Sequence, residues 1–522
     1  MTKITIFLSL WLGLASLSFG LKNPIIRGWN PDPHVIRVDN TYYVAVSSFL
    51  TYPGIPIYKS QDLVNWELIS HAIDDPQKVP ITGTRTGNGT FILGHGIWAP
   101  SLSYINGRFY VTSMAMTGSD PDYRTWPRMF WVSSKDLKAW SEVVWGEPYG
   151  IDPHLFQDPI SKKTYLTIMG LNNGFNRLWG ISQCQVDLES GACGTGATHR
   201  ASIARSKSPE GPWDSSPTNP LIFNGADSNL VVGNTGHATF ADTPDGKWFA
   251  TFLARRYVDK WSVLGRETFF APVSWKDGWP TMNNGDYVLL SQSYDYGPNA
   301  TYPPKPYEDR FEGPELRPSW YQLRSPYSKT YRLKSKGNGV ILVPNVYTLS
   351  DRDTPSAILR KQQSVNMTFS ATLLPTQKGL GPYQSVGISA YSSELAHQDL
   401  GVRGCAHSTG LCIFSMILTY SPQSEEFPLK LTQIPSDLQL HIRSEPRQYK
   451  LGYSISDQET KWVKAFSPSL LPVGFDGVMF GLFASGNSFP WPHDGPEVGF
   501  SKIREEYYDE GFGDYKDGKE GE

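Results

Sequence analysis

Two short sequence patterns alternate between residues 24 and 280, and they constrain the fold more than any other feature of the chain. The first is a turn followed by an aromatic-rich run, and it occurs at residues 39–46, 106–112, 163–168 and 245–252. The second is a strand-like run that enters a polar turn, and it occurs at residues 60–66, 134–140, 183–191, 206–213 and 268–279. Repeated units that cannot bury their own faces are typical of β-propeller blades. We therefore predict an all-β propeller in which the first pattern forms inner hairpins and the second forms outer strands.

The alternation is broken once. Along the chain the order is inner, outer, inner, outer, inner, outer, outer, inner, outer. Five outer elements against four inner ones predict a five-bladed propeller with an incomplete fourth blade, because the inner hairpin of that blade is missing between Gly191 and Ile203. Such a gap removes central packing and exposes strand edges, which makes misfolding a hazard.

The repeat ends near Leu290, and a second organisation follows. We predict that the propeller spans residues 21–293 and that the Pro- and Tyr-rich residues 294–307 form a semi-rigid linker. Residues 308–503 alternate apolar and polar side chains in places and contain short apolar runs, which is typical of a β-sandwich. Residues 504–522 are acidic and glycine-rich, and they predict a disordered tail.

Length and charge narrow the possible partners. A chain of 522 residues has room for two or more domains. Lys and Arg (47) nearly balance Asp and Glu (50), and the net charge of −3 offers no surface for a phosphate backbone. Beyond the N-terminal residues, no apolar stretch approaches the ~20 residues of a membrane span. We therefore expect neither nucleic acid nor a membrane as a partner.

The N-terminal residues indicate secretion. Residues 1–20 contain an early lysine, a mostly apolar stretch and small residues at the end, which is the layout of a cleavable secretory signal; a membrane anchor is the alternative. Three glycosylation sequons agree with an extracellular protein, at Asn88, Asn299 and Asn366. The cysteines form two close pairs that permit two local disulfides, with free buried thiols as the alternative: Cys184 with Cys193, and Cys405 with Cys412.

The tripeptide Asp-Pro-His occurs twice, at residues 32–34 and 152–154, each time before a strand-like aromatic run. Asp32 stands between two prolines, which fix the backbone on both sides and present the carboxylate rigidly, as a general base requires. Asp152 has a similar local sequence. Equivalent carboxylates at the starts of the innermost strands of two blades would converge on the propeller axis. The alternatives are a surface turn at Asp32 and a coincidental Asp in the repeat at Asp152.

Several further motifs, together with these two, resemble glycoside hydrolase family 43, and specifically its two-domain β-xylosidase and α-L-arabinofuranosidase members. The resemblance spans nearly the whole chain after residue 20. It rests on Asn23-Pro24-Ile25, Asn30-Pro31-Asp32-Pro33, Ser47-Ser48-Phe49, residues 53–58, Ile97-Trp98-Ala99-Pro100, Ile151-Asp152-Pro153, Thr235-Gly236-His237-Ala238, Gly265-Arg266-Glu267-Thr268 and residues 311–316.

The resemblance implies an inverting hydrolase on a five-bladed propeller, followed by a concanavalin A-like β-sandwich. Asp32 would be the general base that activates water, and Asp152 would orient the general acid and tune its pKa. No cofactor is implied, although His237 would lie near the propeller axis, where a structural calcium ion could be linked to it through water. A hydrogen-bonded core histidine is the alternative for His237. The sugar pocket would be lined by Trp98, Arg266 and Phe49.

The resemblance also implies a general acid that this chain lacks. In the family, the acid is a Glu in a Glu-Gly-Pro-His stretch that opens the inner hairpin of blade four. Here Cys193 runs directly into Gly194-Thr195-Gly196, which resembles the end of the loop that follows that hairpin. We assign none of three other glutamates as the acid: Glu189, Glu210 and Glu312.

The sequence therefore predicts a secreted glycosidase that acts on xylose- or arabinose-containing plant oligosaccharides or polysaccharides and is impaired by the loss of its acid. A lost exon or a faulty gene model is one origin, and a degenerate paralogue is another. The alternatives are a non-catalytic carbohydrate-binding protein and a protein-binding scaffold. Xylose and arabinose, exo and endo action, and the oligomeric state are not distinguished.

Overall fold

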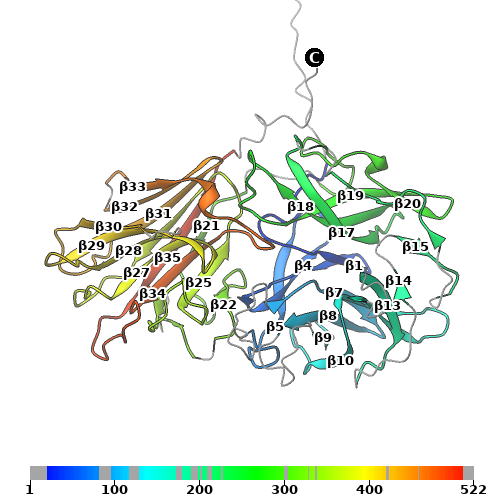
Figure 1. Cartoon of the computed structure of the whole chain (residues 1–522), viewed down its shortest axis with the longest axis horizontal. Helices are drawn as coiled ribbons and strands as arrows, with labels where there is room; N and C mark the ends of the chain where they lie inside the picture. Colours follow the sequence, from blue (N-terminus) through cyan, green and yellow to red (C-terminus); the bar gives the residue numbers. More distant parts are fainter. Residues whose placement is uncertain are drawn as a thin grey trace, which may run out of the picture.

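The computed structural model describes residues 20–81, 96–116, 128–171, 179–189, 198–199, 203–208, 214–224, 227, 229–298, 304–326, 328–334, 338–418, 423–456 and 458–509. In these ranges the regular structure is β, apart from two short 3-10 helices, η1 (Asn283–Gly285) and η2 (Pro468–Leu470). No helix in the described ranges is long and apolar enough to cross a membrane. Figure 1 shows two β domains side by side, the first in blue to green and the second in yellow to red. The all-β prediction is confirmed.

Four propeller blades are four-stranded antiparallel sheets, and in blade two β6 (Gly96–Ile97) also pairs with β8. Blade one contains β1 (His34–Val38), β2 (Thr41–Ala45), β4 (Gly54–Ser60) and β5 (Glu67–Ile73). Blade two contains β7 (Ser101–Ile105), β8 (Arg108–Met116), β9 (Arg128–Ser134) and β10 (Val144–Tyr149). Blade three contains β11 (Ile151–Gln157), β12 (Thr164–Leu171), β13 (Trp179–Gln185) and β14 (Thr198–His199). Blade five contains β17 (Val232–Asp242), β18 (Trp248–Arg256), β19 (Glu267–Lys276) and β20 (Trp279–Met282).

The predicted inner patterns form the second strands β2, β8, β12 and β18 together with the turns before them. In β18 every residue after the first is buried, and its phenylalanines pack against those of β19. The turn before β8 is made by Asn106 and Gly107, whose φ angles of 50° and 76° are those that a tight hairpin between twisted strands requires. Apolar side chains and turn residues thus specify the same hairpins.

Blade four has only two short strands in the described part of the chain, β15 (Ala204–Arg205) and β16 (Asp214–Ser215). Residues 200–203 alone separate β14, the outermost strand of blade three, from β15. Four residues cannot supply a pair of strands of the usual ~5 residues each and a turn. The described residues agree with a blade four without an inner hairpin, but most of the predicted place of the loss, between Gly191 and Ile203, lies outside the described residues, so the loss stays a prediction.

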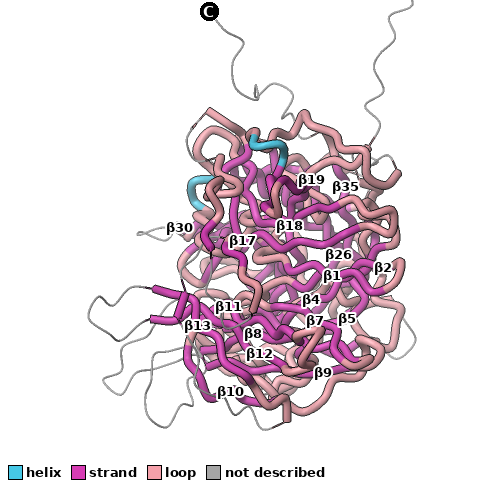
Figure 2. The backbone as a smooth tube through the Cα atoms, turned by 90° about the vertical axis from the view of Figure 1, so that its right-hand side faces the viewer, coloured by secondary structure: helices cyan, strands magenta, loops and turns pink. Residues whose placement is uncertain are grey.

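Among the described residues, the contacts between innermost strands are uneven around the propeller ring. Figure 2 shows β1, β7, β11 and β17 near one another in the middle of the propeller. Strand β1 packs against both β7 and β17, and β7 packs against β11, whereas no comparable contact joins β11 to β17 among the described residues. On the other side of the ring, the N-terminal segment closes the blades, because Leu21 exchanges backbone hydrogen bonds with Tyr294 and Ile26 pairs with Thr268.

The second domain is a sandwich of two antiparallel sheets around one apolar core. One sheet contains β21 (Tyr307–Asp309), β23 (Tyr331–Leu333), β24 (Val340–Leu342), β26 (Met367–Leu373), β31 (Leu438–Glu445), β32 (Gln448–Ile455), β33 (Lys461–Phe466) and β35 (Val498–Tyr507). The other contains β25 (Ser356–Lys361), β27 (Ser385–Ser393), β28 (Ala396–Gly404), β29 (Leu411–Ile417), β30 (Gln423–Pro428) and β34 (Met479–Ser485).

Some features fall outside the expected ranges or outside the described residues. Strand β35 pairs with β26 as far as Tyr507, so the sandwich continues past residue 503, where we placed its end. The Cys405–Cys412 disulfide forms, and Cys184 is also disulfide-bonded, while Cys193 lies outside the described residues. The predicted signal, residues 1–20, lies outside the described residues except for Gly20, and so does the tail from residue 510.

The two domains are joined by backbone pairing as well as by side chains. Strand β22 (Gln322–Leu323) of the second domain pairs with β3 (Thr51–Tyr52) of the first. Nearby, the Val478 amide donates to the carbonyl of Val263 at 2.8 Å. This docking places the loop before β34, residues 472–478, next to the start of blade one.

Candidate active site

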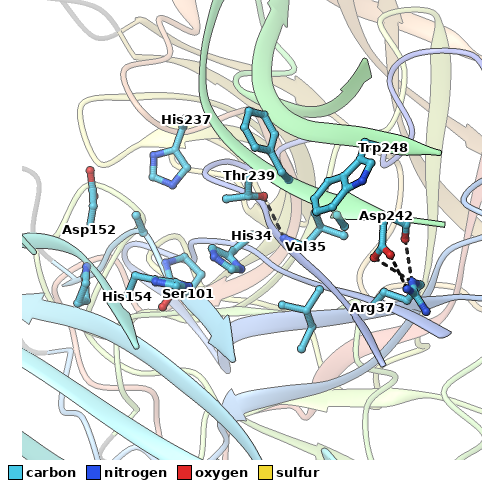
Figure 3. A pocket seen from close by; sticks show the side chains of 16 residues that line it. His34, Val35, Arg37, Ser101, Asp152, His154, His237, Thr239, Asp242 and Trp248 are labelled. Atoms are coloured by element: carbon cyan, nitrogen blue, oxygen red, sulfur yellow. Dashed lines mark hydrogen bonds and ion pairs between the residues drawn. The ribbon is translucent and has the colours of Figure 1, made fainter. Parts of the chain in front are cut away.

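A cavity of about 550 Å³ lies among the innermost strands β1, β7, β11 and β17. Figure 3 shows Asp152 and His237 at one end of this cavity and Arg37, Asp242 and Trp248 at the other. Its lining residues are His34, Val35, Ile36, Arg37, Ala99, Pro100, Ser101, Asp152, Pro153, His154, His237, Thr239, Phe240, Ala241, Asp242 and Trp248. His34 of the first Asp-Pro-His stretch and all three residues of the second line this cavity, whereas Asp32 does not line it.

Asp32 lies two residues before β1, and its side chain is buried. One carboxylate oxygen accepts a hydrogen bond from the Ser47 hydroxyl at 2.6 Å, and the other accepts one from the Arg266 guanidinium at 2.8 Å. Arg266 comes from the segment before β19 of blade five, so two blades hold one carboxylate. The Asp32 side chain is thus fixed in a single orientation, as the prediction of a general base requires.

Asp152 is in β11, and its side chain is exposed to solvent within the cavity. The pKa of Asp152 is raised, chiefly because the surrounding protein displaces water from its carboxylate. The negative charge of Asp32 raises this pKa further, whereas His237 and Arg266 oppose the shift. The structure therefore brings Asp32, Asp152, His237 and Arg266 within electrostatic reach of one another.

Several of these residues share an uncommon backbone conformation. The φ angles of Asp32, Asp152 and His237 are 53°, 52° and 56°, and that of Phe49 is 46°. Residues other than glycine rarely adopt positive φ, and those that do are concentrated at functional sites, where the surrounding structure holds them. In β11 and β17 the strand register shifts at this point, which turns the side chain toward the cavity.

An aromatic group stands beside Asp32. The ring of Phe49 stacks on Phe475 with centroids 6.1 Å apart and lies 6.4 Å from the ring of Trp98. The Arg266 guanidinium lies 4.2 Å above the Phe475 ring. The predicted pocket residues Phe49, Trp98 and Arg266 are therefore brought together around a residue that sequence reasoning missed, and Phe475 comes from the second domain.

The comparison with known families decides the identity. A model described as Glycosyl hydrolases family 43 matches residues 21–190 and 188–280. The chain belongs to this family. The Beta xylosidase C-terminal Concanavalin A-like domain matches residues 308–490, which agrees with the sandwich.

Relatives that match most of the chain agree with this assignment. The Non-reducing end alpha-L-arabinofuranosidase BoGH43B of Bacteroides ovatus is 29% identical, over 93% of this chain and 95% of that protein. The Xylan 1,3-beta-xylosidase of a Vibrio species is 27% identical, over 73% and 80%. The solved structure of the Bacteroides ovatus protein, titled Xyloglucan PUL GH43B, superimposes with a TM-score of 0.79 at 26% identity and covers 94% of this chain and 100% of that one. The BlXynB structure from Bacillus licheniformis gives 0.80 at 22% identity, over 94% and 100%, and supports the fold alone.

Three histidines line the cavity of this family 43 chain: His34, His154 and His237. The rings of His34 and His154 stack with centroids 5.2 Å apart, and the Leu102 amide donates to Nδ1 of His34 at 3.3 Å. Burial lowers the pKa of His154 to about 4. Burial also lowers the pKa of His34 well below its ordinary value, and the positive charges that His154 and His237 carry when protonated lower it further. These two rings are therefore neutral near pH 7 and pack as a pair.

A calcium ion at His237 stays a prediction. Calcium takes six to eight oxygen ligands. In the described residues no group of three or more His, Cys, Asp or Glu side chains is arranged to hold a metal, so protein ligands alone do not fit such an ion here. We derive no step that uses one.

No glutamate lines the cavity among the described residues; its carboxylates are Asp152 and Asp242. Asp242 forms an ion pair with Arg37, with 2.7 Å between Oδ2 of Asp242 and Nη2 of Arg37. Glu189 is exposed beyond β13, and Glu312 is exposed at the entry of the sandwich. Glu210 lies outside the described residues, between β15 and β16. The described part of the site thus contains the predicted base and the predicted Asp152 but no glutamate acid.

Proposed function

We propose that this chain acts on O-glycosidic bonds of xylose- or arabinose-containing plant oligosaccharides or polysaccharides, with inversion, and that its turnover is greatly reduced because the acid-bearing segment is absent. The observation that carries the proposal is a contrast. Both carboxylate oxygens of Asp32 are hydrogen-bonded, whereas blade four has two strands among the described residues. The family match supports a loss in this region, because it falls into two segments that overlap at residues 188–190, just before the predicted place of the loss. The signal-like residues 1–20 support secretion to the extracellular space.

Asp32 has the geometry of a base that activates water. Its two oxygens are anchored by Ser47 and Arg266, and each oxygen has a further lone pair that can accept a proton from water. In an inverting reaction the water attacks from the face of the sugar opposite the leaving group, while an acid protonates the departing oxygen. This chain can supply the first half of that reaction.

The second half lacks its proton donor. Asp152 would orient and tune an acid at the blade-four position, where the inner hairpin is missing. A positioned general acid contributes about 10²- to 10⁴-fold, and its loss matters most for sugar leaving groups. A nitrophenolate departs without a proton, so hydrolysis of nitrophenyl pentosides should persist at a low rate.

Turnover on two kinds of substrate tests the proposal. We expect slow release of nitrophenol from nitrophenyl xyloside or arabinofuranoside, with the product sugar of inverted anomeric form by NMR, and barely detectable hydrolysis of xylo-oligosaccharides. Hydrolysis of xylo-oligosaccharides at ordinary enzymatic rates would contradict the proposal. Sequencing the genomic DNA and the transcript around codons 193 and 194 tests its origin, because an in-frame segment that encodes Glu-Gly-Pro-His would identify a faulty gene model.

A second function, carbohydrate binding without catalysis, is favoured by the aromatic group of Phe49, Trp98 and Phe475, which is retained beside Asp32. Isothermal titration with xylose, arabinose and their oligosaccharides distinguishes the two functions. If the chain binds these sugars but leaves nitrophenyl pentosides intact even on long incubation, carbohydrate binding would be supported and the proposed hydrolase function would be excluded.

A further inference from the structure

A lysine of the sandwich is buried against the turn of the propeller that precedes Asp32. Lys361 ends β25, and its side chain is 5% exposed. Its ammonium donates a hydrogen bond to Oδ1 of Asn30 at 3.0 Å and lies 5.3 Å and 5.1 Å from the ring centroids of Trp29 and Tyr321. Among the described residues no carboxylate forms an ion pair with this ammonium. Burying an ammonium whose partners are one amide oxygen and two aromatic faces reduces the free energy of unfolding, so we expect this lysine to serve a function.

The partner of Lys361 is the residue that fixes the turn before Asp32. Oδ1 of Asn30 also accepts the Tyr58 hydroxyl at 2.7 Å, and its Nδ2 donates to the carbonyls of Arg27 and Gly28. Its backbone amide donates to the carbonyl of Arg266 at 2.9 Å. Asn30 therefore connects the base turn to the backbone of the arginine that contacts Asp32.

The surroundings of Lys361 contain few charges. His71 of β5 contacts the Tyr321 ring edge to face, and burial lowers the pKa of His71 to about 3, with the Lys361 charge adding to this shift. Tyr58 of β4 and Tyr321 face the same region, and burial raises both of their pKa values. The neighbouring Arg360 pairs instead with Glu505. Burial lowers the pKa of Lys361 itself to about 7.

We propose that Lys361 is a positioning residue. Through it the sandwich holds the Asn30-Pro31-Asp32 turn, and this keeps the Asp32 carboxylate oriented toward the attacking water. The proposal rests on the role of Asp32 proposed above. It assigns the sandwich a part in the reaction chemistry in addition to the contact that Phe475 makes. Lys361 itself does not reach the reacting atoms.

This role differs from a structural one in a measurable way. Replacing a buried, unpaired cation with an apolar side chain of similar length is often neutral or stabilising. If Lys361 only joined the domains, its replacement would leave kcat unchanged, whatever its effect on the melting temperature. A positioning residue should instead lose kcat while the melting temperature is kept, because Asn30 retains the Tyr58 hydroxyl as a donor.

The test uses the full chain with nitrophenyl xyloside or arabinofuranoside and four variants: Lys361→Met, Tyr58→Phe, Arg447→Met and Asp32→Asn. Arg447→Met is the matched control, because Arg447 of the sandwich pairs with Asp259 of the propeller and so also joins the two domains. We expect Lys361→Met to lower kcat roughly tenfold with KM within about twofold and with no loss of melting temperature. Tyr58→Phe should lower kcat as well, and the double variant should lose less than the product of the two effects. Arg447→Met should change neither kcat nor KM.

The outcomes separate the two proposals. An unchanged kcat in Lys361→Met, or parallel falls of kcat and melting temperature in Lys361→Met, would overturn the positioning role. If Lys361→Met does not fold, an unchanged kcat in Tyr58→Phe would overturn it. Full activity in Asp32→Asn would instead overturn the proposed function, and the positioning role with it.

Discussion

The two sides of the active site are built in different ways. On the base side, Asp32 is buried and contacts Ser47 of blade one and Arg266 of blade five. On the acid side, Asp152 is exposed, and the neighbouring blade four has two short strands among the described residues. The base side draws its contacts from blades one and five and from the sandwich, all of which are retained. Under the proposed function the acid side depends on one hairpin, so the loss of a single segment would remove the proton donor and leave the base in place.

The largest effect should come from completing the acid side. Insertion of a hairpin that opens with Glu-Gly-Pro-His between Cys193 and Gly194 should raise hydrolysis of xylo-oligosaccharides by about 10²- to 10⁴-fold, because the leaving sugar would then be protonated. Product formation by chromatography measures this. The same insertion with Gln in place of Glu is the control, and equal rates for the two would show that the acid is not what the chain lacks.

Next in size is the loss of the base. Asp32→Asn should reduce the slow hydrolysis of nitrophenyl pentosides by at least about 10²-fold, because water would have no carboxylate to take its proton. Asp242→Asn is the matched control: Asp242 lines the central cavity at the end opposite Asp152 and pairs with Arg37. A similar loss in both variants would point to general damage to the cavity.

A smaller effect is expected at the aromatic group. Phe475→Ala removes the stack on Phe49 and the ring under Arg266, and contacts of these kinds are each worth about 1 kcal/mol. We expect pentose binding by calorimetry to weaken roughly five- to tenfold, since 1.4 kcal/mol corresponds to tenfold in affinity. Phe489→Ala, which removes an exposed ring packed at a tilt against Tyr383, should leave binding unchanged. Equal binding by the two variants would exclude Phe475 from the pocket.

The smallest effect concerns stability against pH. The pKa of Lys361 is about 7 in the folded chain and about 10.4 in an unfolded one, so between these values the unfolded state binds more protons and the stability of the native chain rises with pH. The melting temperature of Lys361→Met relative to the native chain should therefore be highest at or below pH 7 and decline toward pH 10. Calorimetric scans from pH 6 to 10 measure it, with Arg447→Met as a reference. A difference that does not vary with pH would contradict a buried, uncompensated ammonium.

Much of this organisation could be predicted from the sequence because it is local. The turn-and-strand repeats specify the blades, and the break in their alternation is a matter of counting along the chain. Asp32 and Asp152 stand out because proline follows both and the motif repeats. The glycines around Phe475 offered only a weak signal of an exposed loop aromatic, and Lys361 offered none. Their contacts join residues 446 and 331 positions apart, Phe475 with Trp29 and Lys361 with Asn30, and only the docking of the domains creates them.

The central claim is that this chain has a base without an acid, and the dependence of rate on the leaving group tests it most directly. In a series of aryl pentosides whose phenols have increasing pKa values, kcat/KM should fall steeply as the phenol pKa rises, because the departing oxygen receives no proton. The account predicts this steep decline, continuing to barely measurable hydrolysis of xylo-oligosaccharides. A nearly flat dependence would show that a proton donor is present and would contradict the account.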